Sequence, residues 1–155
     1  GETFVMPEAK IQEQTKLVPG IDGQKMSKSK NNVIDIFQND KALRKQIMAI
    51  KTDSTPLEDP KDWKSCNCFA LYDLLASEQE IQVMKKNYEA GGYGYGHAKQ
   101  ALFELICSKF SQERERYNHY MAHPEDVEKV LAIGAKKASR VAHEVLDRVR
   151  EKLGY

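Results

Sequence analysis

The sequence predicts a mainly α-helical protein that begins with a short remnant of a β-sheet. From about residue 39 onward, apolar residues recur every three or four positions, the spacing that buries one face of a helix. Before that point the apolar residues form two short runs, Phe4-Val5-Met6 and Leu17-Val18, and a proline ends each run. Such runs are typical of strands, and they predict the last strands of a sheet whose remainder is missing.

Composition limits the classes of function. The chain has 155 residues, 41% of them hydrophobic, which suffices for one ordinary core in one or two small domains. Lys and Arg number 24 against 23 Asp and Glu, so any basic binding site must be local. No apolar run can cross a bilayer and no secretory leader is visible, which favours a cytoplasmic protein. The first residues do not resemble a natural start, and we expect a piece of a longer polypeptide.

The cysteines and histidines do not predict a metal site. Three cysteines form an odd number without C-x-x-C spacing, so a disulfide framework is not expected either. We interpret Cys66, Cys68 and Cys107 as buried or incidental thiols. The histidines lack a matching arrangement of ligands, and we interpret them as structural. They are His97, His119, His123 and His143.

Capping residues and breaks define the first helices. Asn32 is positioned to cap a short helix over residues 33–37, and Asp40 to cap a second helix that ends near Ile50. Residues 52–64 contain two prolines and three aspartates, and they predict a surface connection that a tryptophan pins down.

The later helices carry stronger signals. Asn67 is positioned to cap one helix, and Ser77 begins the next with the Ser-x-x-Glu spacing of a capping box. Gly91-Gly92 is expected to end that helix in a left-handed turn. A long helix is predicted over residues 97–121, and a last helix, started by proline, over residues 124–154.

The feature with the clearest chemistry is the run Lys25-Met26-Ser27-Lys28-Ser29, which places two ammonium groups and two hydroxyls on one loop. Glycines and asparagines flank the run, so we expect no regular helix or strand across it and expect the glycines to act as hinges. Cleavage of ATP between its α and β phosphates builds negative charge on pyrophosphate. Lysines that reach this charge as the bond breaks lower the barrier selectively. The run therefore predicts nucleotide chemistry, with Met26 packed against adenine.

A solvated basic turn and a P-loop are the alternatives to nucleotide chemistry of this kind at residues 25–29. A methionine inside the run argues against a merely solvated turn. A P-loop is excluded, because no G-x-x-x-x-G-K-[ST] string leads into a helix, and no G-x-G-x-x-G string is present.

Residues 25–29 are identical to the Lys-Met-Ser-Lys-Ser (KMSKS) motif of class I aminoacyl-tRNA synthetases. Their context resembles the tryptophanyl-tRNA synthetases over nearly the whole chain. The strings that carry this second resemblance are residues 1–8, 88–94 with Lys99, 112–117 and 134–142. The five-residue motif indicates the class, and the later strings indicate tryptophan.

The resemblance implies activation of tryptophan with Mg-ATP to Trp-AMP and transfer to tRNA(Trp) by a homodimer. It implies that Lys25 and Lys28 are catalytic, because they contact the ATP phosphates and stabilise the transition state. No protein-bound metal and no membrane are implied. The rest of the implied ATP site comprises Met26, Ser27, Ser29, Leu17 and Val18, the last two through backbone groups near adenine.

The resemblance also implies two regions. Residues 1–38 would form the C-terminal edge of a Rossmann-like catalytic domain with the KMSKS loop, and residues 39–155 a helical bundle that binds the anticodon region of tRNA. The candidate phosphate contacts are Arg114, Arg116, Lys136, Lys137 and Arg140.

The chain departs from the family in what it lacks. The family's His-Ile-Gly-His motif and tryptophan pocket lie upstream of the lysine loop, and Gly94-Tyr95-Gly96-His97 comes in the wrong order to replace them. We therefore expect the isolated chain to be inactive. A non-catalytic helical tRNA-binding module and a fragment of a tyrosyl-tRNA synthetase remain as alternatives.

Overall fold

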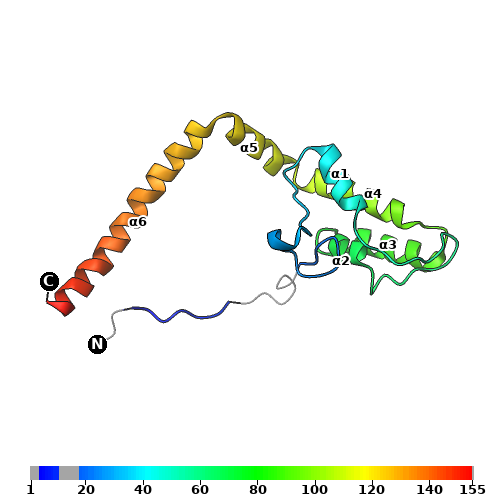
Figure 1. Cartoon of the computed structure of the whole chain (residues 1–155), viewed down its shortest axis with the longest axis horizontal. Coiled ribbons are helices and arrows are strands. Elements are labelled where there is room, and N and C mark those ends of the chain that lie inside the picture. The colour runs from blue at the N-terminus through cyan, green and yellow to red at the C-terminus, as the bar shows by residue number, and fades with distance from the viewer. Residues whose placement is uncertain (1–3, 11–17, 155) are drawn as a thin grey trace. The chain divides into compact units, whose positions relative to one another are not determined.

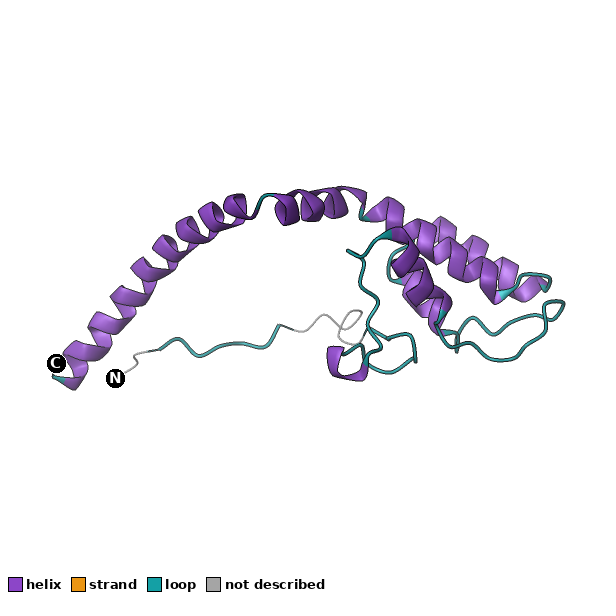
Figure 2. Ribbon diagram, turned by 45° about the horizontal axis from the view of Figure 1, so that its top comes forward, coloured by secondary structure: helices purple, strands orange, loops and turns teal. Residues whose placement is uncertain are grey.

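The computed structural model describes residues 4–10 and 18–154 and is built from helices joined by loops (Figure 1). The chain divides into two compact units, residues 12–115 and residues 1–11 with 116–155. Within the described residues no segment forms a β-strand, as Figure 2 also shows, and an isolated antiparallel bridge pairs Pro19 with Lys25. The prediction of a mainly α-helical protein is therefore confirmed.

The first predicted strand is not formed. Phe4-Val5-Met6 lies outside any helix or strand, and Val5 is 95% exposed. A strand needs a neighbour that pairs with its backbone groups and a face that it buries, and no described segment supplies either. In the second predicted run, Leu17 lies outside the described residues.

The larger unit contains α1 (Asp40–Met48), α2 (Asn67–Asp73), α3 (Glu78–Ala90) and α4 (Tyr95–Lys109). Helix α4 packs against α1 and α2. Each helix contributes its apolar face to one core, which is why the three-to-four spacing of the sequence is reproduced as burial. The largest fully buried apolar members are Leu43, Ile47, Ile50, Cys68, Tyr88 and Leu102.

Several predicted helix boundaries need correction. No helix forms over residues 33–37. Helix α1 is capped by Asn39, whose Oδ1 accepts from the backbone N–H of Ala42 at 3.0 Å, and α2 is preceded by Cys66, so each cap lies one residue earlier than predicted. The predicted helix over 97–121 is two helices, because Phe110 leaves helical geometry with φ −105° and ψ 19°.

Other boundaries agree with the sequence. The capping box of α3 is present. The backbone N–H of Ser77 donates to Glu80 Oε2 at 2.8 Å, and the backbone N–H of Glu80 donates to Ser77 Oγ. Helix α5 (Ser111–Ala122) follows Phe110, and α6 (Pro124–Leu153) begins with proline and ends at Gly154 in the left-handed region.

The turn after α3 differs in detail from the prediction. Gly91 has φ 74° and ψ 172°, a positive φ outside the left-handed helical region. A Cβ on Gly91 would also lie 2.3 Å from the carbonyl oxygen of Glu58. Glycine is therefore required here both for its φ and for the close approach of the connection that precedes α2.

That connection, residues 52–64, is organised by a buried lysine that the sequence did not reveal. Lys61 is 4% exposed, and its ammonium group donates to the carbonyls of Pro56 at 2.9 Å, Leu57 at 3.3 Å and Asp59 at 3.0 Å. Trp63 anchors the end of the connection as predicted, because its Nε1 donates to a carboxylate of α3 at 3.0 Å.

Replacing Lys61 with methionine should lower the free energy of unfolding by about 2–3 kcal/mol, because three carbonyls lose one charged donor. Urea unfolding followed by circular dichroism measures this loss. Lys86→Met, on the exposed face of α3, is the matched control and should change stability by less than about 0.5 kcal/mol. Equal losses in both variants would show that the Lys61 contacts are not stabilising.

Candidate nucleotide-binding loop

The lysine loop, residues 18–32, starts as a narrow hairpin. The backbone N–H of Met26 donates to the Val18 carbonyl at 2.9 Å, and Gly23 makes the turn with φ 81°. The chain then forms one 3-10 turn, η1 (Lys28–Lys30). The prediction that no regular helix crosses residues 25–29 is therefore wrong, because this short 3-10 turn includes Lys28 and Ser29.

The side-chain amide of Asn32 holds this loop from inside. Asn32 is 1% exposed, and its Nδ2 donates to Asp22 Oδ1 at 2.8 Å and to the Lys25 carbonyl at 3.1 Å. Its Oδ1 accepts from the Ser27 N–H at 2.7 Å, and its backbone carbonyl accepts from the Ile21 N–H at 3.0 Å. One buried residue thus fixes four points of the loop, which is why it is not available to cap a helix over 33–37.

Gly20 leaves the space that this amide occupies. A Cβ on Gly20 would lie 2.4 Å from the carbonyl oxygen of Asn32 and 2.6 Å from its Cγ. Because the φ of Gly20 is not positive, close packing and not the turn requires glycine here. The hydrogen bond from Asn32 lowers the pKa of Asp22 below its ordinary value, so this carboxylate is an ionised acceptor at neutral pH.

The two predicted catalytic lysines project from this fixed backbone. Lys25 and Lys28 are exposed, and within the described part of the chain neither ammonium group has an acidic or hydrogen-bonding partner. Between them, the hydroxyls of Ser27 and Ser29 lie 2.9 Å apart. Cations without internal partners can neutralise an anionic ligand such as a polyphosphate.

Met26 and Val18 face an apolar pocket of about 350 Å³. Other lining residues are Ile34, Ile36, Leu71, Leu74, Leu102 and Phe110. Met26 also packs against the hydrophobic core, and these contacts within the protein explain its half-buried state. The expected packing of Met26 against adenine remains a prediction, and so does the role of Leu17, which lies outside the described residues.

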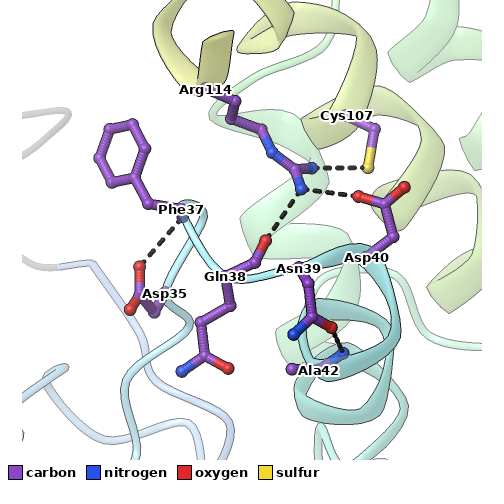
Figure 3. Close-up of polar contacts among 8 residues, drawn as sticks. All are labelled: Asp35, Phe37, Gln38, Asn39, Asp40, Ala42, Cys107 and Arg114. Atoms are coloured by element: carbon purple, nitrogen blue, oxygen red, sulfur yellow. Dashed lines mark hydrogen bonds and ion pairs between the residues drawn. The ribbon is translucent and has the colours of Figure 1, made fainter. Parts of the chain in front are cut away.

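Among the predicted phosphate-binding residues, Arg114 is held inside the chain (Figure 3). Its Nη2 donates to the Gln38 carbonyl at 2.9 Å and to Asp40 Oδ1 at 2.6 Å, and its Nη1 donates to Cys107 Sγ at 3.1 Å. The side chain is only 15% exposed. Arg114 therefore ties the start of α5 to the segment that leads into α1.

The other four predicted phosphate-binding residues are free to meet a ligand. Each is exposed and has no partner among residues 4–10 and 18–154. They are Arg116 on α5 and Lys136, Lys137 and Arg140 on α6.

Two of the three thiols are buried, and the four histidines are exposed. Cys66 and Cys68 are buried, and burial raises the pKa of the Cys68 thiol to about 12. The structure does place carboxylates near two histidines, His119 with Asp126 at 3.4 Å and His123 with a glutamate, which the sequence did not indicate. No group of three metal ligands forms among the described residues. Among residues 4–10 and 18–154, no helix combines the length and the apolar character that a membrane span requires.

Comparison with protein families decides the class. Residues 3–111 match the family model described as tRNA synthetases class I (W and Y), which is well over half of the chain. The chain belongs to this class I tRNA synthetase family.

Similar members of the family are tryptophan enzymes. The tryptophan–tRNA ligases of Campylobacter jejuni (strain RM1221) and Rhodopirellula baltica are each 46% identical over 154 residues, covering 99% of this chain and 48% of theirs. A solved tryptophanyl-tRNA synthetase from C. jejuni, complexed with ADP and tryptophan, matches with a TM-score of 0.90 at 45% identity. That match covers 100% of this chain and 49% of the solved chain. The chain therefore spans about half the length of these relatives.

Asn32→Ala should release the lysine loop, because the Ser27 N–H, the Lys25 carbonyl and the Asp22 carboxylate all lose a buried partner. We expect a loss of about 3 kcal/mol in stability and faster hydrogen exchange at the Ser27 amide. NMR-detected exchange measures the second effect. Gln24→Ala, an exposed change in the same loop, should leave exchange at Ser27 unaltered. Unchanged protection in Asn32→Ala would contradict the assigned role.

Arg114→Ala should lower the free energy of unfolding by about 1–2 kcal/mol, since a mostly buried guanidinium and its bond to the Gln38 carbonyl are lost. The pair with Asp40, whose side chain is 73% exposed, contributes little. Arg116→Ala, two residues away and exposed, is the control and should stay within about 0.5 kcal/mol of the parent. Thermal unfolding of the three proteins compares them, and an unaltered midpoint for Arg114→Ala would exclude a structural role.

Proposed function

We propose that this chain is part of a tryptophan–tRNA ligase, which activates tryptophan with Mg-ATP to Trp-AMP and transfers the tryptophanyl group to tRNA(Trp). The observation that carries this proposal is the 46% identity to tryptophan–tRNA ligases across 99% of the chain. The solved relative that holds ADP and tryptophan supports it further. A tyrosine enzyme shares the family, yet the similar relatives described above are named for tryptophan.

In this proposal, residues 25–29 are the KMSKS loop of the ligase. Lys25 and Lys28 bind the β and γ phosphates of ATP and take up the charge that develops on pyrophosphate as the α-phosphate is transferred to the tryptophan carboxylate. Their lack of internal partners in the described part of the chain supports this role, because no ion pair must be broken first. Ser27 and Ser29 supply hydroxyl donors to the same phosphates.

The adenine end of ATP is placed by the start of the loop. We assign Met26 and the backbone of Leu17 or Val18 to this end, since Met26 and Val18 lie together at an apolar pocket. The Val18 carbonyl already accepts from the Met26 N–H, so adenine would use the remaining lone pair of that oxygen. Mg²⁺ enters with ATP as part of the substrate.

The two parts of the chain receive different roles. Residues 1–38 belong to the edge of a Rossmann-like catalytic domain, where Phe4-Val5-Met6 would find its missing partner strands. Residues 39–155 bind the anticodon region of tRNA(Trp). Accessible basic residues contact phosphates there: Arg116, Lys136, Lys137 and Arg140. Arg114 is the weakest candidate, because its guanidinium is already committed within the chain.

The longer relatives also support proposals for the remaining substrates and partners. Tryptophan is bound by protein sequence outside this chain, so the 155 residues alone should not support tryptophan-dependent pyrophosphate exchange. We further propose that the intact ligase is a cytoplasmic homodimer.

Lys28→Ala in the full-length ligase should reduce the rate of tryptophan-dependent pyrophosphate exchange about a hundredfold, because one donor to the developing charge is lost. Tryptophan affinity should change by less than about twofold. Lys30→Ala, on the same 3-10 turn, is the control and should retain nearly full exchange. A loss of tryptophan affinity as large as the loss in rate would mean that the loop binds substrate uniformly and does not act in the transition state.

A further inference from the structure

The side-chain amide of Asn67 has no role in the helix that it begins. Asn67 is the first residue of α2, and Cys66 precedes it as the cap. Among the described residues this amide forms no hydrogen bond. The side chain is half-buried, whereas the next two residues, Cys68 and Phe69, are buried in the core. Neither capping nor core packing therefore accounts for an asparagine at this position.

The amide lies against the tip of the lysine loop, which is Gly23. A Cβ on Gly23 would lie 2.5 Å from Nδ2, 2.7 Å from Oδ1 and 2.9 Å from Cγ of Asn67. Three atoms at such short distances mean that the whole amide group packs where a side chain of residue 23 would project. Gly23 also has φ 81°, so its backbone conformation and this contact both require glycine.

A second contact reaches the same turn from the end of α1. The backbone N–H of Lys51 donates to the Ile21 carbonyl at 2.7 Å. Lys51 and Asn67 also line one recess of about 250 Å³ next to the turn. The hydrogen bond restrains Ile21 and leaves Gly23, two residues further on, without a bond to the helices. The Asn67 amide is therefore the contact that limits how far the tip moves toward α2.

The hairpin transmits a movement of its tip to the first catalytic lysine. The Gly20 N–H donates to the Gln24 carbonyl at 2.7 Å. The Met26 N–H donates to the Val18 carbonyl at 2.9 Å. These two bonds flank Lys25, so the arms of the hairpin move together and a shift of the tip becomes a shift of Lys25. Catalytic groups act only when they are held within about 0.5 Å of the productive position.

We propose that Asn67 is a positioning residue for the formation of Trp-AMP, because its amide stops the tip of the lysine loop and thereby sets where Lys25 and Lys28 meet the ATP phosphates. The inference rests on the proposed function, since it assumes that these lysines act on ATP. Asn67 itself is assigned no contact with ATP. The lysines stabilise charge that develops as the bond breaks, so loss of the stop should lower kcat more than it weakens the binding of ATP.

Asn67→Ala in the full-length ligase should lower kcat for tryptophan-dependent pyrophosphate exchange about tenfold, while KM for ATP changes by less than about threefold. Asn67→Ser, which also removes the amide and suits the start of a helix, is a second variant and should give the same loss. Asn67→Asp keeps the shape of the side chain and should retain kcat within about threefold. Asp73→Ala, an exposed change at the other end of α2, is the control and should leave both constants unaltered.

A double-mutant cycle tests the contact itself. Gly23→Ala should lower kcat in the parent ligase, because the added methyl group overlaps the amide. In the Asn67→Ala background the methyl group enters the space that the amide leaves, so the same change should cost at least about threefold less. The cost of alanine at φ 81° is common to both backgrounds, and the difference between them reports the contact.

The outcomes separate this inference from the proposed function. A parent ligase without tryptophan-dependent exchange would overturn the proposed function. With exchange present, the inference is overturned while the function stands if Asn67→Ala and Asn67→Ser keep the parent kcat, or if they raise KM for ATP as much as they lower kcat. Equal costs of Gly23→Ala in the two backgrounds would also overturn it.

Discussion

The lysine loop depends on one buried amide, that of Asn32. An amide in a nearly inaccessible position must satisfy its donors and its acceptor within the protein, and leaving them unpaired costs more than each bond gains. The groups available to it lie at Asp22, Lys25 and Ser27, so burial of the amide dictates where the loop runs. Burial of this amide also requires glycine at position 20, because the Cβ of any larger residue would clash with Asn32. The backbone is fixed while the ammonium groups remain unpaired within the described residues, which is the preorganisation that stabilisation of developing charge requires.

The lysine loop contacts the helical part of the larger unit at three points. The Ile21 carbonyl accepts from the Lys51 N–H at 2.7 Å, just after α1. At Gly23, a Cβ would lie 2.5 Å from Nδ2 of Asn67, the first residue of α2. Met26 packs toward the apolar pocket that α2 and α4 line. The positions of the lysines are therefore set relative to the ends of α1 and α2 and do not follow from the local sequence alone.

How far the sequence predicts this arrangement depends on the range of each interaction. The capping box at Ser77 and the proline start of α6 involve neighbours along the chain, and both were predictable. Asparagine is a residue type that commonly caps helices. Only the fold shows that the side-chain amide of Asn32 instead forms hydrogen bonds with residues five to ten positions earlier. Lys61 would likewise be assigned to the surface by its type, whereas three converging carbonyls bury it. Arg114 and Arg116 are alike in sequence, and contacts with residues 74 and 76 positions away separate a structural arginine from a free one.

Helix α2 connects the lysine loop with a pocket of about 300 Å³ that Tyr72 and Tyr93 line together with residues of α3. Asn67 at its start contacts the turn at Gly23, and Tyr72 near its end forms a wall of the pocket. Between them Cys68, Phe69 and Leu71 are buried in the core, so the helix is held by close packing along its length. A helix of seven residues packed in this way moves as one body, and a displacement of Tyr72 is also a displacement of Asn67. The lysine loop and this pocket therefore share one support, helix α2.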